Sequence, residues 1–281
     1  MVLAESKRRA KLILQITAMI LALLLLASCA GRMPAGQDKR DDEARSEDAL
    51  QPEEPTEEPD SQPGTSGSGE SVADSFSAYT EAKGELITRL SNALANNPGT
   101  EFDSMSLLNL VMVDMLLLPA SVFGAGEEAA SFTLGILGAQ NIVYTEDGNR
   151  YSVKYDNEEG HYEVQGFYNE AADALKCAVL ADGKEILSSE YYKTSYGYAG
   201  QIFAAGDEGS SMVYQLTISG QDGVVGISEA AAAPSELTGG ETPDFPKSNK
   251  EWYAIEGTQV TGVTADGREI SFEYTPPDDN N

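Results

Sequence analysis

Apart from its carboxylates, the chain holds few residues of the types that commonly carry chemistry. It has a single histidine, His161, and two cysteines, Cys29 and Cys177. A lone histidine cannot build a multi-histidine metal site, and no cysteine cluster or His-Glu helix motif stands beside it. The sequence also lacks the motifs of a nucleophilic serine, a phosphate-binding loop and a dinucleotide site. We therefore expect no catalytic residue, no metal site and no cofactor.

Carboxylates are plentiful, with 46 Asp and Glu residues. Two of them could act as acid and base in a hydrolysis, but among so many acids a close pair arises by chance. The acidic turns 156–159 and 206–208 could offer oxygens to calcium. Neither has the spacing of an EF-hand loop, so we interpret both as solvated turns. An envelope hydrolase with paired carboxylates remains the alternative function.

The most suggestive stretch is the tyrosine-rich segment 191–198. If the strand continues through it, alternation places Tyr192, Tyr196 and Tyr198 on one face of a sheet. There they could stack on a sugar or line an apolar pocket, although tyrosine also favours strands for packing reasons alone. These three tyrosines are our candidate binding residues, for an apolar or a carbohydrate ligand.

Two further residues would matter if they were buried. Cys177 lies in the apolar run 174–180 without a cationic neighbour in sequence, so we interpret it as a small buried apolar residue. Asp114 lies within a very apolar segment, where a buried carboxylate needs a partner or a raised pKa. We favour a position for Asp114 on a solvent-facing stripe.

The elements that must position these residues begin with two or three helices. A helix-start signal at Ser71 precedes apolar residues at helical spacing up to Leu94. A second helix is predicted over 104–118, ended by Pro119, and a shorter third helix over 127–138. The second is apolar on nearly all sides, so we expect it to be deeply covered. It is too short and too polar to span a membrane.

From residue 141 onward the pattern changes to short strands. Asp-Gly pairs at 147, 182, 222 and 266 indicate hairpins, because glycine accepts the positive φ of such turns. Strands are predicted over 141–145, 150–155, 161–168, 174–181, 184–194, 198–205, 212–219, 224–228, 252–256, 259–264 and 269–274. A long loop is predicted over 229–250. The fold class is α+β: two or three N-terminal helices packed on a curled antiparallel β-meander.

The first 28 residues are typical of a bacterial signal peptide, with basic residues at 7–11 and an apolar run of residues 12–26. The run ends in Leu26-Ala27-Ser28-Cys29, which resembles the lipobox of bacterial lipoproteins. In that family the cysteine takes a diacylglyceryl group and the chain is cut before it. The resemblance covers only the N-terminus, and it implies a chain anchored to the cell membrane through lipid on Cys29, on the extracytoplasmic side. The alternative is an uncleaved apolar helix with a chance cysteine.

The rest of the chain divides by composition. Residues 29–71 carry Cys29 and an acidic tether rich in Pro, Ser and Gly, which is predicted to be disordered and which favours a Gram-positive cell. Residues 72–275 are predicted to form a single α+β domain, and 276–281 a disordered tail. The net charge is −28, and it becomes −31 without residues 1–28, which hold four basic residues and Glu5. This charge excludes the basic surface of a nucleic-acid-binding protein.

The predicted function follows mainly from these exclusions. We expect a membrane-anchored, surface-exposed lipoprotein without enzymatic activity, acting as a ligand-binding carrier or as an envelope interaction module. Helices followed by a meander loosely resemble the lipoprotein-carrier fold, in which a curled sheet covered by helices holds an acyl chain. A closed apolar cavity would favour the carrier, whereas carboxylates around an aromatic-lined cleft would favour the hydrolase.

Overall fold

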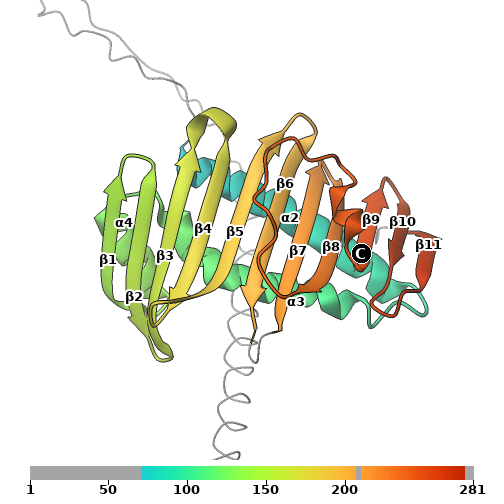
Figure 1. The fold of residues 1–281 in the computed structure, drawn as a ribbon, viewed down its shortest axis with the longest axis horizontal. Helices are drawn as coiled ribbons and strands as arrows, with labels where there is room; N and C mark the ends of the chain where they lie inside the picture. Colours follow the sequence, from blue (N-terminus) through green and yellow to red (C-terminus); the bar gives the residue numbers. More distant parts are fainter. Residues whose placement is uncertain (1–70, 207–209, 276–281) are drawn as a thin grey trace, which may run out of the picture. The chain divides into compact units, whose positions relative to one another are not determined.

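The computed structural model of the chain describes residues 71–206 and 210–275. The predicted signal peptide, the lipobox with Cys29, nearly all of the tether and the C-terminal tail lie outside these residues. Within them, three α-helices precede an 11-stranded antiparallel sheet, so the fold is α+β and dominated by strands (Figure 1).

Helix α2 (Val72–Asn96) begins at the predicted residue. The Ser71 side chain accepts a hydrogen bond from the Asp74 backbone N–H at 3.2 Å, which satisfies one of the free donors at the helix start. Apolar residues at helical spacing, among them Leu86, Leu90 and Leu94, are fully buried. This face of α2 packs on two strands of the sheet, β7 (Ser211–Ser219) and β9 (Glu251–Glu256).

The second α-helix is shorter than predicted, but a 3-10 helix continues it past residue 118. Helix α3 (Ser104–Asp114) runs directly into the 3-10 helix η1 (Met115–Val122), so Pro119 does not end it. Inside an α-helix, proline removes one hydrogen bond and its ring clashes with the carbonyl four residues earlier. The segment around Pro119 is a 3-10 helix instead. The expectation that this helix is too short and too polar to span a membrane was wrong, because α3 and η1 together, Ser104–Val122, are long and apolar enough to do so by length and composition alone. The third predicted helix is confirmed as α4 (Glu127–Ile136).

The expectation that α3 is deeply covered was wrong. Its buried residues are Leu107 and Leu110, whereas Met105, Leu108 and Met112 are 59%, 52% and 44% exposed. One side of α3 packs against α2, and no described element covers these three side chains. A helix that is apolar on nearly all sides therefore has apolar surface that the described residues leave uncovered.

All eleven predicted strands are present, and each one pairs with its neighbours in chain order. Besides β7 and β9 they are β1 (Gln140–Asp147), β2 (Arg150–Asn157), β3 (Gly160–Asn169), β4 (Ala174–Ala181), β5 (Lys184–Thr194), β6 (Gly197–Ala205), β8 (Asp222–Ala230), β10 (Gln259–Val263) and β11 (Glu269–Glu273). Two of the predicted Asp-Gly turns are displaced. Asp147 pairs with Arg150, so Gly148-Asn149 form the first turn. Ser219 pairs with Asp222, so Gly220-Gln221 form the turn before β8, with Gly220 at φ +61°, and Asp222-Gly223 lie inside β8.

One face of the sheet is apolar and covered by the helices (Figure 1). The strand register places Val164, Val179 and Leu187 side by side across β3, β4 and β5 on this face. Further along, the rings of Tyr79 in α2 and Tyr191 in β5 stack with their centroids 4.2 Å apart. Side chains thus fill the layer between α2 and the sheet at this point.

The opposite face of the sheet is crossed by residues 231–250, which we call the strap (Figure 1). The long loop predicted over 229–250 is therefore present as an ordered segment that includes the short 3-10 helix η4 (Phe245–Ser248). The strap lies close to the sheet at Gly226, where a Cβ atom would be 2.2 Å from the Pro246 carbonyl oxygen. Only glycine permits this approach.

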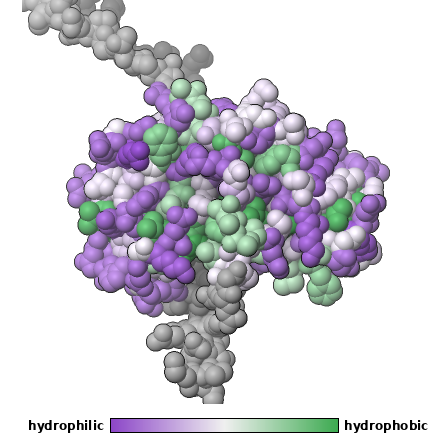
Figure 2. Space-filling view, viewed as in Figure 1, coloured by the Kyte–Doolittle hydropathy of each residue, from purple (hydrophilic) through white to green (hydrophobic). Residues whose placement is uncertain are grey.

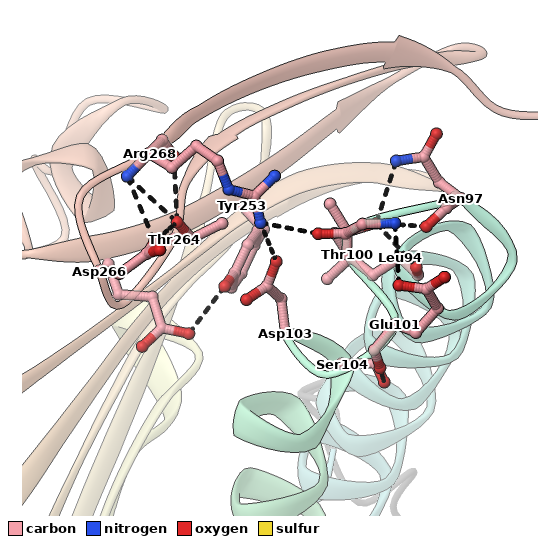
Figure 3. A network of polar contacts seen from close by, with 12 residues as sticks. Leu94, Asn97, Thr100, Glu101, Asp103, Ser104, Tyr253, Thr264, Asp266 and Arg268 are labelled. Carbon is pink, nitrogen blue, oxygen red and sulfur yellow. Dashed lines mark hydrogen bonds and ion pairs between the residues drawn. The ribbon is translucent and has the colours of Figure 1, made fainter.

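A polar network fastens the helical layer to the far end of the sheet (Figure 3). In the turn between β10 and β11, Arg268 Nη2 donates to the Gly99 carbonyl at 2.7 Å and pairs with Asp103 at 3.1 Å. Thr100 Oγ1 in turn donates to the carbonyl of Leu94 at the end of α2. The connection between α2 and α3 is thereby held against the last hairpin.

Candidate functional site

The three candidate tyrosines do not share a face. Strand β5 ends at Thr194, which pairs with Gly197 across a tight turn, so Tyr198 belongs to β6. The Tyr198 ring packs edge-on against Tyr79 in the helical layer, with centroids 5.6 Å apart. The expected alternation fails because the turn interrupts the strand.

Tyr192 and Tyr196 lie on the strap face and contact the strap itself. Tyr196 Oη donates a hydrogen bond to the Glu241 carbonyl at 3.1 Å. A Cβ atom on Gly239 would lie 3.0 Å from the Tyr192 ring, so the strap backbone runs directly against that ring. These two tyrosines hold the strap on the sheet.

A row of polar side chains crosses the middle of the strap face. The register aligns Lys176, Glu190, Gln201 and Gln215 on β4, β5, β6 and β7. Gln215 Nε2 donates to Gln201 Oε1 at 2.9 Å, and Gln201 Nε2 donates to Glu190 Oε1 at 2.7 Å. Asn249 of the strap donates to Gln215 Oε1 at 2.8 Å. Each amide thus donates toward the carboxylate, and hydrogen bonds in such a chain polarise one another.

The strap is bound to this row by its own backbone. The Leu237 N–H donates to Glu190 Oε1 at 2.8 Å, and Gln201 Nε2 also donates to the Ser235 carbonyl at 2.8 Å. Glu190 is only 8% exposed as a result. The strap therefore buries Glu190, which would otherwise lie on an open face of the sheet.

A pocket of about 280 Å³ opens beside this junction, between β4–β6 and the strap. Its wall holds three carboxylates, those of Glu185, Glu190 and Glu236, and one ammonium group, that of Lys176. Phe203 and Pro234 supply apolar surface. The strap face around it is mostly hydrophilic, with apolar residues in small separate patches (Figure 2).

One oxygen of the pocket-lining Glu190 has no hydrogen-bond partner among the described residues, namely Oε2, which is fully buried. The nearest cation is Lys176 Nζ at 3.7 Å, and that group is bound to Glu236 Oε2 at 2.5 Å. Burial alone lowers the pKa of Lys176, but the hydrogen bond to Glu236 and the charge of Glu190 raise that pKa above its usual value. A buried acceptor without a donor costs free energy, so this atom favours any ligand that supplies one.

Two other residues considered from the sequence lie on the helix side of the sheet. Burial raises the pKa of the Cys177 thiol to about 12, and nearby Lys83 offsets only part of this shift. Asp114 was predicted to face solvent, but its Oδ1 lies 2.6 Å from Nζ of Lys83, which is 3% exposed. Burial raises the pKa of Asp114 despite this partner. The prediction was wrong because the partner lies on a different helix, at a separation that no local pattern reports.

His161 is exposed at the start of β3. Its Nδ1 lies 2.5 Å from Asp156 Oδ1, and the hydrogen bond and charge of Asp156 raise the pKa of His161 above its usual value. The pair lines a second hollow with the stacked rings of Tyr155 and Tyr162. Within residues 71–206 and 210–275, no group of three His, Cys, Asp or Glu side chains is placed to hold a metal ion.

Comparisons with protein-family models, with curated proteins and with solved structures found no match for this chain.

The strap pocket was not predicted from the sequence. Glu190, Gln201 and Gln215 each occupy a polar position in a predicted strand, and correct hairpin registers would have aligned them. No sequence signal shows that the strap covers them, because residues 231–250 have only the composition of a loop.

Proposed function

We propose that this chain is a lipid-anchored lipoprotein on the extracytoplasmic side of the membrane, and that its folded part is a non-enzymatic binding module with the strap pocket as its site. The observation that supports this most is the carboxylate of Glu190, a residue that lines the pocket: its buried Oε2 has no hydrogen-bond partner among the described residues, and its ion-pair partner Lys176 lies 3.7 Å away. A ligand that donates a hydrogen bond there replaces an unsatisfied group by a charge-assisted bond.

The pocket favours a polar ligand that carries donors. Three carboxylates against one ammonium group leave an excess of negative charge, and Lys176 is already bound by Glu236. Hydroxyl and amino groups together match this wall, and Phe203 offers an apolar surface beside it. Among the ligand classes expected from the sequence, a carbohydrate therefore fits better than an acyl chain, and an amino sugar fits best.

The experiment compares two sugars that differ in charge. We expect the glucosamine disaccharide to bind the full chain in calorimetry, and its N-acetylated counterpart to bind more weakly because it lacks the cationic donor. Glu190→Gln keeps an acceptor for Leu237 but removes the charge, and it should abolish the preference. Glu163→Gln, on the same sheet face and paired with Lys154 at 3.6 Å, is the matched control. Equal binding by both variants would overturn the proposed site.

A carboxylate hydrolase draws on the same pocket, since Glu185, Glu190 and Glu236 gather there. The assignment of Glu190 to binding rests on its Oε1, which is already held by Gln201 and Leu237. Chromatography of the sugar after incubation separates the two functions. Recovery of the intact disaccharide supports a binding module, whereas cleavage that Glu190→Gln abolishes would establish the hydrolase instead.

The membrane anchor rests on the lipobox resemblance at residues 26–29. In a bacterial host, the natural chain should fractionate with membranes and Cys29→Ala should be released or remain unprocessed. Normal membrane association of a processed Cys29→Ala chain would refute the anchor. We also retain the curl of the sheet as a proposal, because a strongly twisted sheet of this size tends to curl.

A further inference from the structure

The helical layer presents an apolar surface that no described element covers. On α3 it consists of Met105, Leu108 and Met112, which are 59%, 52% and 44% exposed. Their spacing of i, i+3 and i+7 places them on one side of the helix. Phe102, just before α3, is 83% exposed and adds to this apolar surface at the N-terminal end of the helix. We call these four residues the apolar stripe.

The residue types of the apolar stripe match the centre of a protein interface. Phenylalanine and methionine are enriched in the cores of such interfaces, and charged residues are depleted there. Methionine side chains also adapt to partners of different shape. Large exposed apolar patches on folded proteins commonly mark interaction sites. The stripe therefore has the composition of a docking surface.

Charge around the apolar stripe selects the kind of partner. Helix α2 packs beside α3, and its solvent-exposed side, away from Lys83, carries Asp74, Glu81 and Glu85. The two cations of the helical layer are already bound, Lys83 by Asp114 and Arg89 by Asp222 and backbone carbonyls. An apolar stripe on a helical layer whose free charges are acidic is complementary to a helix that has an apolar face and basic flanks.

We propose that the apolar stripe docks a basic amphipathic helix of another protein, in the groove-binding mode that reads residues at i, i+3 and i+7. A second copy of this chain fits less well, because it would bring two acidic helical layers together. An anionic membrane surface also fits less well, because that attraction needs free Lys and Arg side chains on the docking face.

The test uses a labelled helical peptide of roughly 15 residues, built from leucine on one face and lysine on the other. Fluorescence anisotropy with the full chain should show saturable binding. Leu108→Ser should weaken that binding at least about tenfold, as for an interface anchor. Val143→Ser is the matched control. Val143 is also 52% exposed, and it alternates with Tyr144, whose hydroxyl contacts Gly124 in the helical layer, so it faces the other way.

Each alternative has its own readout. A scrambled peptide of the same composition should bind at least about tenfold more weakly, because it lacks the apolar face. Equal binding of the scrambled peptide, or equal binding by Leu108→Ser and the natural chain, would overturn the proposal. Self-association that Leu108→Ser abolishes, seen by sedimentation, would assign the stripe to a second copy. Binding to phosphatidylcholine vesicles that depends on Leu108 would assign it to a membrane.

Discussion

Replacing Gln201 by leucine should destabilise the fold by several kcal/mol, because Gln201 links the sheet to the strap. Its side chain is 5% exposed and takes part in three hydrogen bonds. It donates to Glu190 Oε1 at 2.7 Å and to the Ser235 carbonyl at 2.8 Å, and it accepts from Gln215 at 2.9 Å. Leucine has a similar size but can form none of them.

The magnitude follows from the partners that lose a bond. A hydrogen bond to a charged group contributes about 1.5–3 kcal/mol and a neutral one about 1 kcal/mol. The three bonds of Gln201 therefore sum to roughly 3–5 kcal/mol, and the apolar burial of leucine offsets part of this, leaving about 2–4 kcal/mol. In a folded part of this size, each kcal/mol lowers the melting temperature by about 2–4 °C. The expected loss is about 4–16 °C.

The assay is thermal and urea unfolding of the full chain, followed by circular dichroism. Gln165→Leu is the control, since Gln165 is exposed on the same sheet face and donates one hydrogen bond, to Glu163 at 2.9 Å. Its substitution should change stability by less than about 0.5 kcal/mol. Proteolysis should also cut the strap faster in Gln201→Leu. Equal, small losses in both variants would show that the polar row contributes nothing to stability.

Three further outcomes are expected. In an NMR titration of the only histidine, the pKa of His161 should lie above 6.5 and fall back toward it in Asp156→Asn. Because the folded-state pKa is raised, the stabilisation is complete below the unfolded pKa and disappears as pH rises through the folded one, so stability that rises over that window would contradict the ion pair. Leu110→Ala should lower the free energy of unfolding in urea by about 2–5 kcal/mol, against less than about 1 kcal/mol for Leu108→Ala at an exposed position. Equal losses would contradict the burial of Leu110. Gly226→Ala should push the strap outward and speed hydrogen exchange of its amides, and unchanged exchange would contradict the close approach.

The strands could be predicted because their signals are local. Strands β4 and β5 have the predicted bounds, since the positive φ of Asp182 and Gly183 suits the turn between them. Helix α2 could be predicted equally well, because Ser71 caps it and its leucines follow the helical period. In each case the physical cause lies within a few residues of the feature.

The predictions that were wrong concern features set by contacts between residues that are distant in sequence. The apolar character of α3 indicated burial on all sides, but burial also requires enough neighbours, and the described residues leave Met105, Leu108 and Met112 largely exposed. Tyr198 was misplaced because one turn reverses the face of every later residue. For Glu190, composition could not show that Leu237 would donate to it from the strap.

The meander also sets an order in which the chain can fold. Every strand pairs with the strand made just before it, so the sheet can grow one hairpin at a time during synthesis. Of the described elements, helix α2 is synthesised first, yet its Leu86 packs against Gly223 in β8, far later in the sequence. Closing so long a loop is entropically costly, and contacts of large sequence separation slow folding. The native contact between Leu86 of α2 and β8 can therefore form only after β8 has been synthesised.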